Sequence, residues 1–223
     1  MNTKLYIETI KKECTFLEKE GYIFTLLENN IYYSKKNNSE GFRISFSWSE
    51  YGDKFTTQGL TAKKRFNIVE NEIKKILTGE LEDYYTIHKT LSTNYIPKEL
   101  EFKEVGNNIC FPTNTVENIK LFSQLLKIFY SKTVLEFFKY YEHISAIDNK
   151  LEELLELKKI QSILTSSGNS AIHRFYIISF ICENNPIKNF FIETYFPYLK
   201  DNLDNELNKI ELEKFKILQR NLE

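Results

Sequence analysis

The chain has 223 residues, of which 42% are hydrophobic and 27% are charged, and its formal net charge is −1. This composition is ordinary for a folded protein and excludes an intrinsically disordered one, and the length allows one large domain or two small ones. The charge supplies no overall attraction to nucleic acid or to an anionic membrane. No apolar run approaches the ~18 residues that a membrane-spanning helix needs, so we expect a soluble cytoplasmic protein with no membrane partner.

The first elements in chain order are a helix and a set of short strands. Residues 3–19 predict an amphipathic helix, because Tyr6, Ile10 and Leu17 recur at helical spacing. Four extended stretches follow, at residues 22–27, 31–35, 42–49 and 54–60. The Asn and Gly residues between them are typical of hairpin loops. The pattern predicts an antiparallel meander, followed by a second helix at 62–77.

The third extended stretch has two different faces. Its apolar residues, Phe42, Ile44, Phe46 and Trp48, alternate with Arg43, Ser45, Ser47 and Ser49. Successive side chains of a strand point to opposite faces of the sheet. We therefore expect the apolar residues to meet the covering helices. The small polar residues are then expected to lie beside Thr56 or Thr57 of the next strand, facing solvent or a partner.

Residues 81–113 lack a clear period. Residues 81–91 are consistent with a fifth strand or a short helix, and residues 92–112 contain two Pro, one Gly and an Asn pair. Such residues favour turns and irregular backbone. The segment is therefore predicted to be a linker or an edge segment.

The remainder of the chain has helical periodicity. Helix starts are predicted at Asn114 or Thr115, at Ser131 or Thr133, near Ser145, at Ser170, at Pro186 and at Pro197. Residues 165–169 are expected to form a turn. Residues 171–183 are almost wholly apolar and predict a buried central helix, and residues 198–221 predict one long final helix.

These elements predict an α+β protein. An N-terminal helix, a four-stranded antiparallel meander and a second helix make up the module at 1–80. An irregular linker or edge segment covers 81–113, and an all-helical bundle covers 114–223. Whether the module and the bundle share one core is left open by the sequence.

Motifs that would carry chemistry are absent from the sequence. The seven glycines are nowhere clustered as a phosphate-binding loop requires. None of the three histidines, His88, His143 and His173, has a second His or Cys at metal-ligand spacing. The three cysteines are odd in number and far apart, as expected of reduced thiols rather than a disulfide framework. We expect no metal and no cofactor.

The first functional hypothesis is a non-enzymatic module that binds another protein. The predicted partner-binding residues are Arg43, Ser45, Ser47, Ser49, Lys54, Lys63, Lys64 and Arg65. A bacterial antagonist of the immunity-protein type is an example of such a module, by analogy of general character alone.

Two other classes of function stay open. An enzyme would assemble its site in a cleft between the two halves from Glu142, His143, His173 and Arg174. A nucleic-acid binder would place the basic residues from Arg43 to Arg65 on one face with an exposed Tyr32, Tyr33 or Tyr51. The amphipathic final helix can also pair with a copy of itself and form a homodimer, or pack back onto its own chain.

Overall fold

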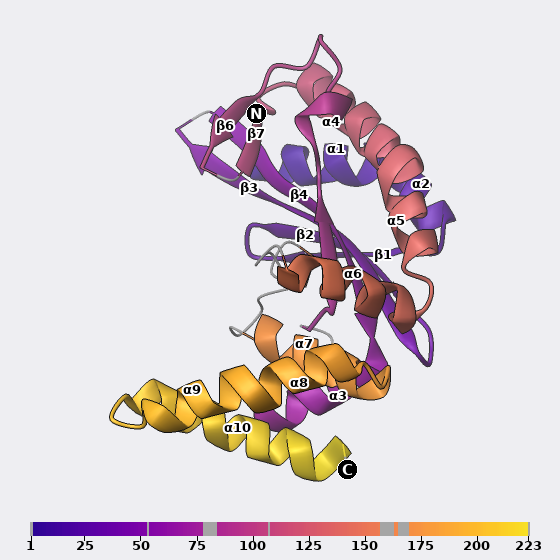
Figure 1. The fold of residues 1–223 in the computed structure, drawn as a ribbon. Coiled ribbons are helices and arrows are strands. Elements are labelled where there is room, and N and C mark those ends of the chain that lie inside the picture. Colours follow the sequence, from indigo (N-terminus) through magenta and orange to yellow (C-terminus); the bar gives the residue numbers. More distant parts are fainter. Residues whose placement is uncertain are drawn as a thin grey trace. The chain divides into compact units, whose positions relative to one another are not determined.

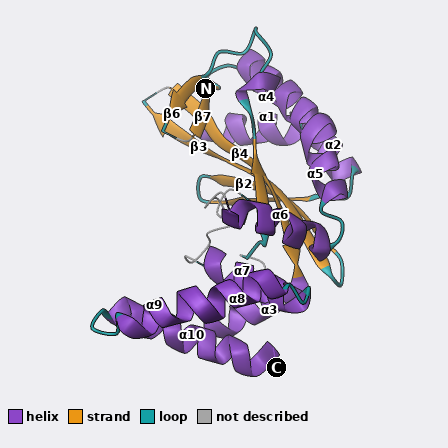
Figure 2. Cartoon of the chain, viewed as in Figure 1, coloured by secondary structure: helices purple, strands orange, loops and turns teal. Residues whose placement is uncertain are grey.

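A computed structural model describes residues 2–52, 54–77, 84–106, 108–156, 163–164 and 170–222. These residues form an α+β fold, with an antiparallel sheet preceded by N-terminal helices and followed by a helical region (Figures 1 and 2). The predicted fold class is confirmed. The turn predicted at 165–169 lies outside the described residues, as do residues 81–83 of the predicted fifth strand.

The N-terminal helix is divided into α1 (Thr3–Glu13) and α2 (Thr15–Lys19), where the sequence predicted one helix. The Ser123 hydroxyl donates a hydrogen bond of 2.8 Å to the Glu13 carbonyl. In a continuous helix that carbonyl would accept from Leu17 N–H, which bonds instead to the Cys14 carbonyl at 3.0 Å. The division at Cys14 therefore has a tertiary cause.

The described residues form a seven-stranded sheet. Its strands are β1 (Ile23–Leu27), β2 (Asn30–Lys36), β3 (Glu40–Tyr51), β4 (Lys54–Phe66), β5 (Ile87–Thr90), β6 (Lys103–Val105) and β7 (Asn108–Pro112). The order is β1-β2-β3-β4-β7-β6, and β5 also pairs with β4. The first four strands are the predicted meander. The sequence predicted irregular backbone at 92–112. This prediction is wrong for β6 and β7, which form a hairpin whose strand β7 pairs with β4.

Strand β4 is longer than predicted. The sequence placed the start of a helix at residue 62, but the strand runs on to Phe66 and helix α3 (Asn67–Ile76) follows it. Leu60, Ala62, Lys64 and Phe66 are all buried, which is the period of two of a strand. Burial along the sheet therefore outweighs the helix propensity of these residues.

A β-bulge at Gly59 reverses the two faces of β4. Before it, the odd-numbered Phe55 and Thr57 are buried; after it, the even-numbered Leu60 and Ala62 are buried. Gly59 has φ +70°, in the left-handed region that favours glycine. The bulge explains how the buried face of one long strand changes from odd to even positions.

Helix α4 (Val116–Phe129) packs against α1 (Figure 1). Thr115 caps α4 by accepting from the Asn118 N–H, as predicted. Its Phe122 ring lies 5.1 Å from the Phe46 ring and 5.6 Å from the Phe111 ring. No new helix starts at Ser131 or Thr133, because the chain continues through a wider turn at 130–134 into α5 (Leu135–Tyr140). Leu135, at the start of α5, is exposed.

The C-terminal helices are α6 (Ile144–Glu156), α7 (Ala171–Ile181), α8 (Asn185–Phe190), α9 (Phe196–Asp201) and α10 (Glu206–Leu222). Helix α7 is buried along most of its length, as predicted. The single long final helix is corrected to α9 and α10. Asn205 separates them, since its side chain accepts from the Leu207 N–H at 3.0 Å and so starts a new helix.

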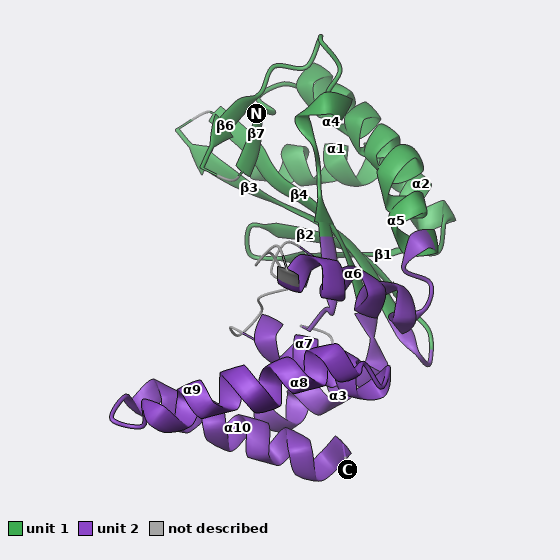
Figure 3. Ribbon diagram, in the orientation of Figure 1, with its two compact units in different colours: residues 1–37, 41–64, 89–139 green, residues 38–40, 65–88, 140–223 purple. Residues whose placement is uncertain are grey.

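The chain divides into two compact units, each assembled from separate segments (Figure 3). Unit 1 comprises residues 1–37, 41–64 and 89–139, and unit 2 comprises residues 38–40, 65–88 and 140–223. The sequence predicted limits near residues 80 and 113 for a module and a helical bundle. The two compact units follow from contacts within the folded chain and do not test whether such parts fold independently. These limits stay a prediction.

Candidate functional site

The sheet of unit 1 has one covered face and one open face. Ile44, Phe46 and Trp48 are buried in the core of unit 1, as predicted from the alternation in β3. Thr57 lies on the same covered face, where its hydroxyl is 2.6 Å from that of Tyr6. The opposite face, called the open face below, carries Ser47 of β3 and, by the same alternation, Thr56 of β4.

One row of residues crosses the open face through six strands. Leu27 of β1 is opposite Asn30 of β2, and Asn30 is opposite Ser47 of β3. A Cβ atom on Gly59 of β4 would lie 4.0 Å from both the Ser47 Oγ and the Asn108 Oδ1. Asn108 of β7 is in turn opposite Val105 of β6. These six are called the open-face row: Leu27, Asn30, Ser47, Gly59, Asn108 and Val105.

The open-face row has exposed aliphatic side chains at its two ends and small side chains at its centre. Leu27 is 61% exposed and Val105 is 62% exposed. Between them lie a serine and a glycine, the two smallest side chains of the row. A partner can therefore bring its own backbone close to the sheet at the centre while its apolar side chains contact the ends.

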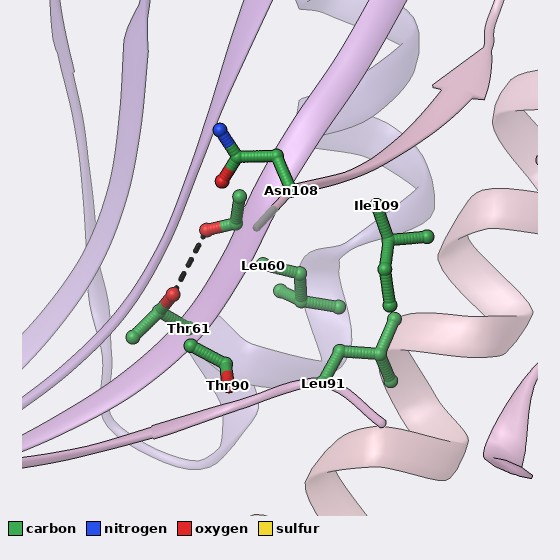
Figure 4. Close-up of a pocket in the computed structure, with 7 residues that line it drawn as sticks. Leu60, Thr61, Thr90, Leu91, Asn108 and Ile109 are labelled. Carbon is green, nitrogen blue, oxygen red and sulfur yellow. Dashed lines mark hydrogen bonds between the residues drawn. The ribbon is translucent and has the colours of Figure 1, made fainter. Parts of the chain in front are cut away.

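A small hollow of about 70 Å³ lies beside Gly59 (Figure 4). Thr61 and Asn108 lie on one side of it, and Leu91 and Ile109 on the other. Strand β4 pairs with β7 up to Gln58, whereas the Leu60 carbonyl accepts from the Leu91 N–H beside β5. The hollow therefore forms where β4 exchanges one partner strand for another. It has room for a few waters or for the tip of one side chain.

Four basic residues of β3, β4 and β6 belong to the open face: Arg43, Lys54, Lys63 and Lys103. Arg43 Nε donates to Ser34 Oγ at 3.1 Å, and its guanidinium carbon lies 4.5 Å from the centre of the Tyr32 ring. Burial, and then the nearby charge of Arg43, lower the pKa of Lys63. The described strand residues of this face include no Asp and no Glu. The open face is therefore basic.

The structure does not bring all the predicted partner-binding residues together. Lys64 is buried on the covered side, with its Nζ 5.3 Å from the centre of the Phe42 ring. Arg65 is also buried, where its Nε donates to Asn67 Oδ1 at 2.9 Å. Ser45 is buried despite its place on the open side, and Ser49 is exposed. The basic helix start expected at 62–65 does not exist, because these residues belong to β4.

Two of the predicted catalytic residues are buried inside unit 2. His173 Nε2 lies 2.9 Å from Glu211 Oε2, and its ring stacks on Phe215 with 4.7 Å between centres. Arg174 forms a bidentate ion pair with Glu70. Neither His173 nor Arg174 has exposed surface, so neither can contact a substrate in this conformation.

The other two predicted catalytic residues lie on the surface of unit 2. Glu142 and His143 border an open hollow of about 580 Å³, whose other walls include Asn38, Asn67 and Ile68. His173 and Arg174 are not among its lining residues. The structure therefore pairs Glu142 with His143 but does not unite the four residues at one surface.

Neither a metal centre nor a membrane span is visible in the described part of the chain. No group of three His, Cys, Asp or Glu side chains is placed to hold a metal ion there. None of its helices combines the length and the apolar character needed to cross a bilayer. The three cysteines are free thiols.

No protein-family model, no curated protein and no solved structure matches this chain. The roles of its residues therefore rest on their own geometry.

Sequence reasoning found only Ser47 of the open-face row. One local signal could have pointed to its centre: in residues 54–66 the apolar positions shift from the odd-numbered Phe55 to the even-numbered Leu60 and Ala62 across Gly59, as a bulge requires. No local signal joins Asn108 and Val105 to this row, because the pairing of β7 with β4 brings together residues about fifty positions apart.

Proposed function

We propose that this protein is a non-enzymatic module that binds another protein on the open face of the unit 1 sheet. The observation that carries the proposal is the open-face row, in which two exposed aliphatic side chains flank a centre made of Ser47 and Gly59. Protein interfaces combine buried apolar contacts with closely fitting backbone and small polar groups in this way.

The energetics of the row favour a partner. Burying an aliphatic side chain fully is worth about 1.5–3 kcal/mol, and Leu27 and Val105 each have more than half of their surface left to bury. Ser47 and Gly59 have little side-chain conformational entropy to lose on binding. A partner that contacts both ends therefore buries apolar surface there, while Ser47 and Gly59 at the centre lose little side-chain entropy.

The enzyme hypothesis has weaker geometric support. It required Glu142, His143, His173 and Arg174 in one cleft, but His173 lies against Glu211, Arg174 is ion-paired with Glu70, and neither has exposed surface. The nucleic-acid hypothesis is weakened in a similar way. It needed exposed cations on one face with an exposed Tyr32, Tyr33 or Tyr51. Tyr51 is 90% exposed, as this hypothesis requires, but Lys64, Arg65 and Tyr33 are buried and Tyr32 is covered by Arg43.

Three more specific predictions about the function, source and location of the protein come from the sequence alone. An antagonist of the immunity-protein type, a bacterial source and a cytoplasmic location stay predictions from the sequence. The homodimer through residues 198–221 also stays a prediction, and the break between α9 and α10 removes the single long helix on which it was based.

Site-specific photo-crosslinking in an extract of the native host tests the proposal. A benzophenone amino acid is placed at Leu27 or at Val105, and the matched control position is Leu135, an exposed apolar residue of α5. We expect both open-face positions to give the same discrete protein adduct and Leu135 to give none. Ser47→Tyr should abolish the adduct by filling the centre, whereas Ser131→Tyr should leave it unchanged. An equal adduct at Leu135, or no adduct at Leu27 and Val105, would contradict the proposal.

A further inference from the structure

We infer that the partner contacts the open-face row with an acidic, extended segment of its chain. The inference rests on the proposed function and adds the chemistry of what is bound. It is carried by the positive charges of the open face, by the lack of an ion pair between Lys54, Lys63 or Lys103 and any described residue, and by the dimensions of the row.

The lysines of the open face differ from most of the lysines in the helices of unit 2, although Lys188 and Lys200 of that unit also form no ion pair with a described residue. In unit 2, Lys75, Lys150, Lys209, Lys214 and Lys216 each pair with a glutamate three residues away. On the open face, Lys54, Lys63 and Lys103 form no ion pair with any residue that the structure describes. The charges of these three lysines are therefore not neutralised by the residues that the structure describes.

Arg43 and Lys63 carry like charges that repel each other on this face. The charge of Arg43 acts on the half-buried Lys63 and, together with burial, lowers the pKa of Lys63. Like charges that are partly removed from water repel each other more strongly than they do in bulk solvent. A carboxylate of the partner beside Lys63 would offset this repulsion, so the ligand that complements Lys63 is anionic.

The shape of the row fits an extended segment. Adjacent strands lie about 4.8 Å apart, so the five steps from β1 to β6 span about 24 Å. An extended chain rises about 3.3 Å per residue, so about seven residues cover that distance. Apolar residues near the two ends of such a segment would contact Leu27 and Val105, and an acidic residue near the Val105 end would reach Lys103, which lies two residues from Val105 on β6.

A protein segment fits this face better than a nucleic acid does. Single-stranded nucleic acids bind by stacking bases on exposed aromatic rings along a strongly basic groove. Of the three tyrosines considered for stacking, only Tyr51 has a well-exposed ring, since Tyr32 is covered by Arg43 and Tyr33 is buried. One exposed ring does not make a row of stacking surfaces, and the whole chain has a formal charge of −1. Exposed aliphatic residues at both ends of the row are a complement for side chains rather than for phosphates.

Three fluorescent probes titrated against the full chain test the inference by anisotropy. The first is a nine-residue peptide with Leu at both ends and Glu and Ser between them. The second has Lys in place of each Glu, and the third is a single-stranded DNA with as many charges as the first peptide. We expect the Glu peptide to bind at least tenfold more tightly than the other two, and to weaken when salt rises from 50 to 500 mM because exposed charges are then screened.

Matched variants locate the binding. Lys103→Glu should weaken the Glu peptide by about threefold to tenfold, as expected of an exposed charge pair. Lys54→Glu should have a smaller effect, because Lys54 is five residues, or about 16 Å, from Gly59 along β4. Lys209→Glu on α10 serves as the control and should leave the affinity unchanged. Ser47→Tyr should abolish binding without changing any charge.

The outcomes separate this inference from the proposed function. Equal binding of the Lys peptide, equal binding of the DNA, or no binding of the Glu peptide overturns the inference. A crosslinked partner whose segment at Val105 lacks Asp and Glu also overturns it, while the proposed protein-binding function stands. The absence of any adduct at Leu27 and Val105 overturns the proposed function itself.

Discussion

Arg174 and Glu70 form a bidentate ion pair in which neither side chain has any exposed surface. Arg174 Nε donates to Glu70 Oε1 at 2.9 Å, and Nη2 donates to Oε2 at 2.7 Å. Ser170 accepts from the third guanidinium nitrogen, and the Thr86 hydroxyl donates to Glu70 Oε1 at 2.8 Å. The pair joins α3 to α7, two helices far apart in sequence, and its partners satisfy the charges that burial would otherwise penalise.

Arg174→Leu should be strongly destabilising. It leaves the Glu70 carboxylate buried without its cation, which costs about 3–5 kcal/mol of unfolding free energy. Urea denaturation followed by circular dichroism measures the loss, and Arg220→Leu on exposed α10 surface is the control, expected to change stability by less than about 0.5 kcal/mol.

The double variant Glu70→Gln/Arg174→Met completes the test of the pair. Since it removes both charges, it should lose less stability than the sum of the two single variants. Additive losses would show that the two side chains do not interact. Binding of the Glu peptide to folded protein should be unaffected, because the pair belongs to unit 2 and the open-face row to unit 1.

Glu211 should make the stability of unit 2 sensitive to acid. Burial acts to raise the pKa of Glu211, but hydrogen bonds and charge from His173 and Lys214 outweigh it and lower the pKa from 4.5 to about 2. A group with a lowered pKa in the folded state stabilises the protein above its unfolded pKa. This contribution is fully present above about pH 5 and is lost as pH falls from 4.5 to about 2.

The measurement for Glu211 is the free energy of unfolding between pH 7 and pH 2.5, for wild type and for Glu211→Gln. The variant should be less stable at pH 7 and should lose less stability on acidification. Glu206→Gln removes an exposed carboxylate that also pairs with a lysine, and should leave the wild-type profile nearly unchanged. Parallel profiles for wild type and Glu211→Gln would rule out this role.

The three cysteines should react slowly with thiol reagents in the folded protein. Burial raises the pKa of both Cys14 and Cys182 to about 11, and it also raises the pKa of Cys110. Since only the thiolate attacks, little of the reactive form exists at pH 7.5. Titration with an aromatic disulfide should therefore be slow in buffer and complete within seconds in denaturant. Cys182, the most exposed of the three, should react first, and rapid native reaction of Cys110 would contradict the burial of that thiol.

The sequence predicted the parts of the fold that follow from local periodicity. Phe46 and Trp48 alternate with serines and are buried, and residues 171–181 are apolar throughout and form the buried α7. It failed where tertiary contacts decide. Residues 62–66 have helix-forming composition but lie in a strand, because the Lys64 stem is buried with its amine above the Phe42 ring.

The candidate site was predictable only in part for the same reason. Ser47 is visible from the alternation in β3. The bulge at Gly59 was not predicted, although the apolar positions Phe55, Leu60 and Ala62 change there from odd to even. Val105 and Asn108 enter the row only through the pairing of β6, β7 and β4. Such pairings are set by the whole sheet, and no spacing within residues 103–112 reveals them.

Variants at Gly59 and Gly21 separate an effect on protein stability from an effect on binding of the Glu peptide. A side chain there would meet no atom closer than 4.0 Å, so its cost comes from the backbone, whose φ of +70° disfavours residues with a Cβ. Gly59→Ala should cost about 1–2 kcal/mol of stability, and Gly59→Asn less, since Asn tolerates this conformation. Both should weaken the Glu peptide, because both place a side chain at the centre of the open-face row. Gly21→Ala, at a φ of +84° in open space after α2, is the matched control. It should lose similar stability and keep full binding, and a loss of peptide binding in that variant would attribute the Gly59 effect to stability alone.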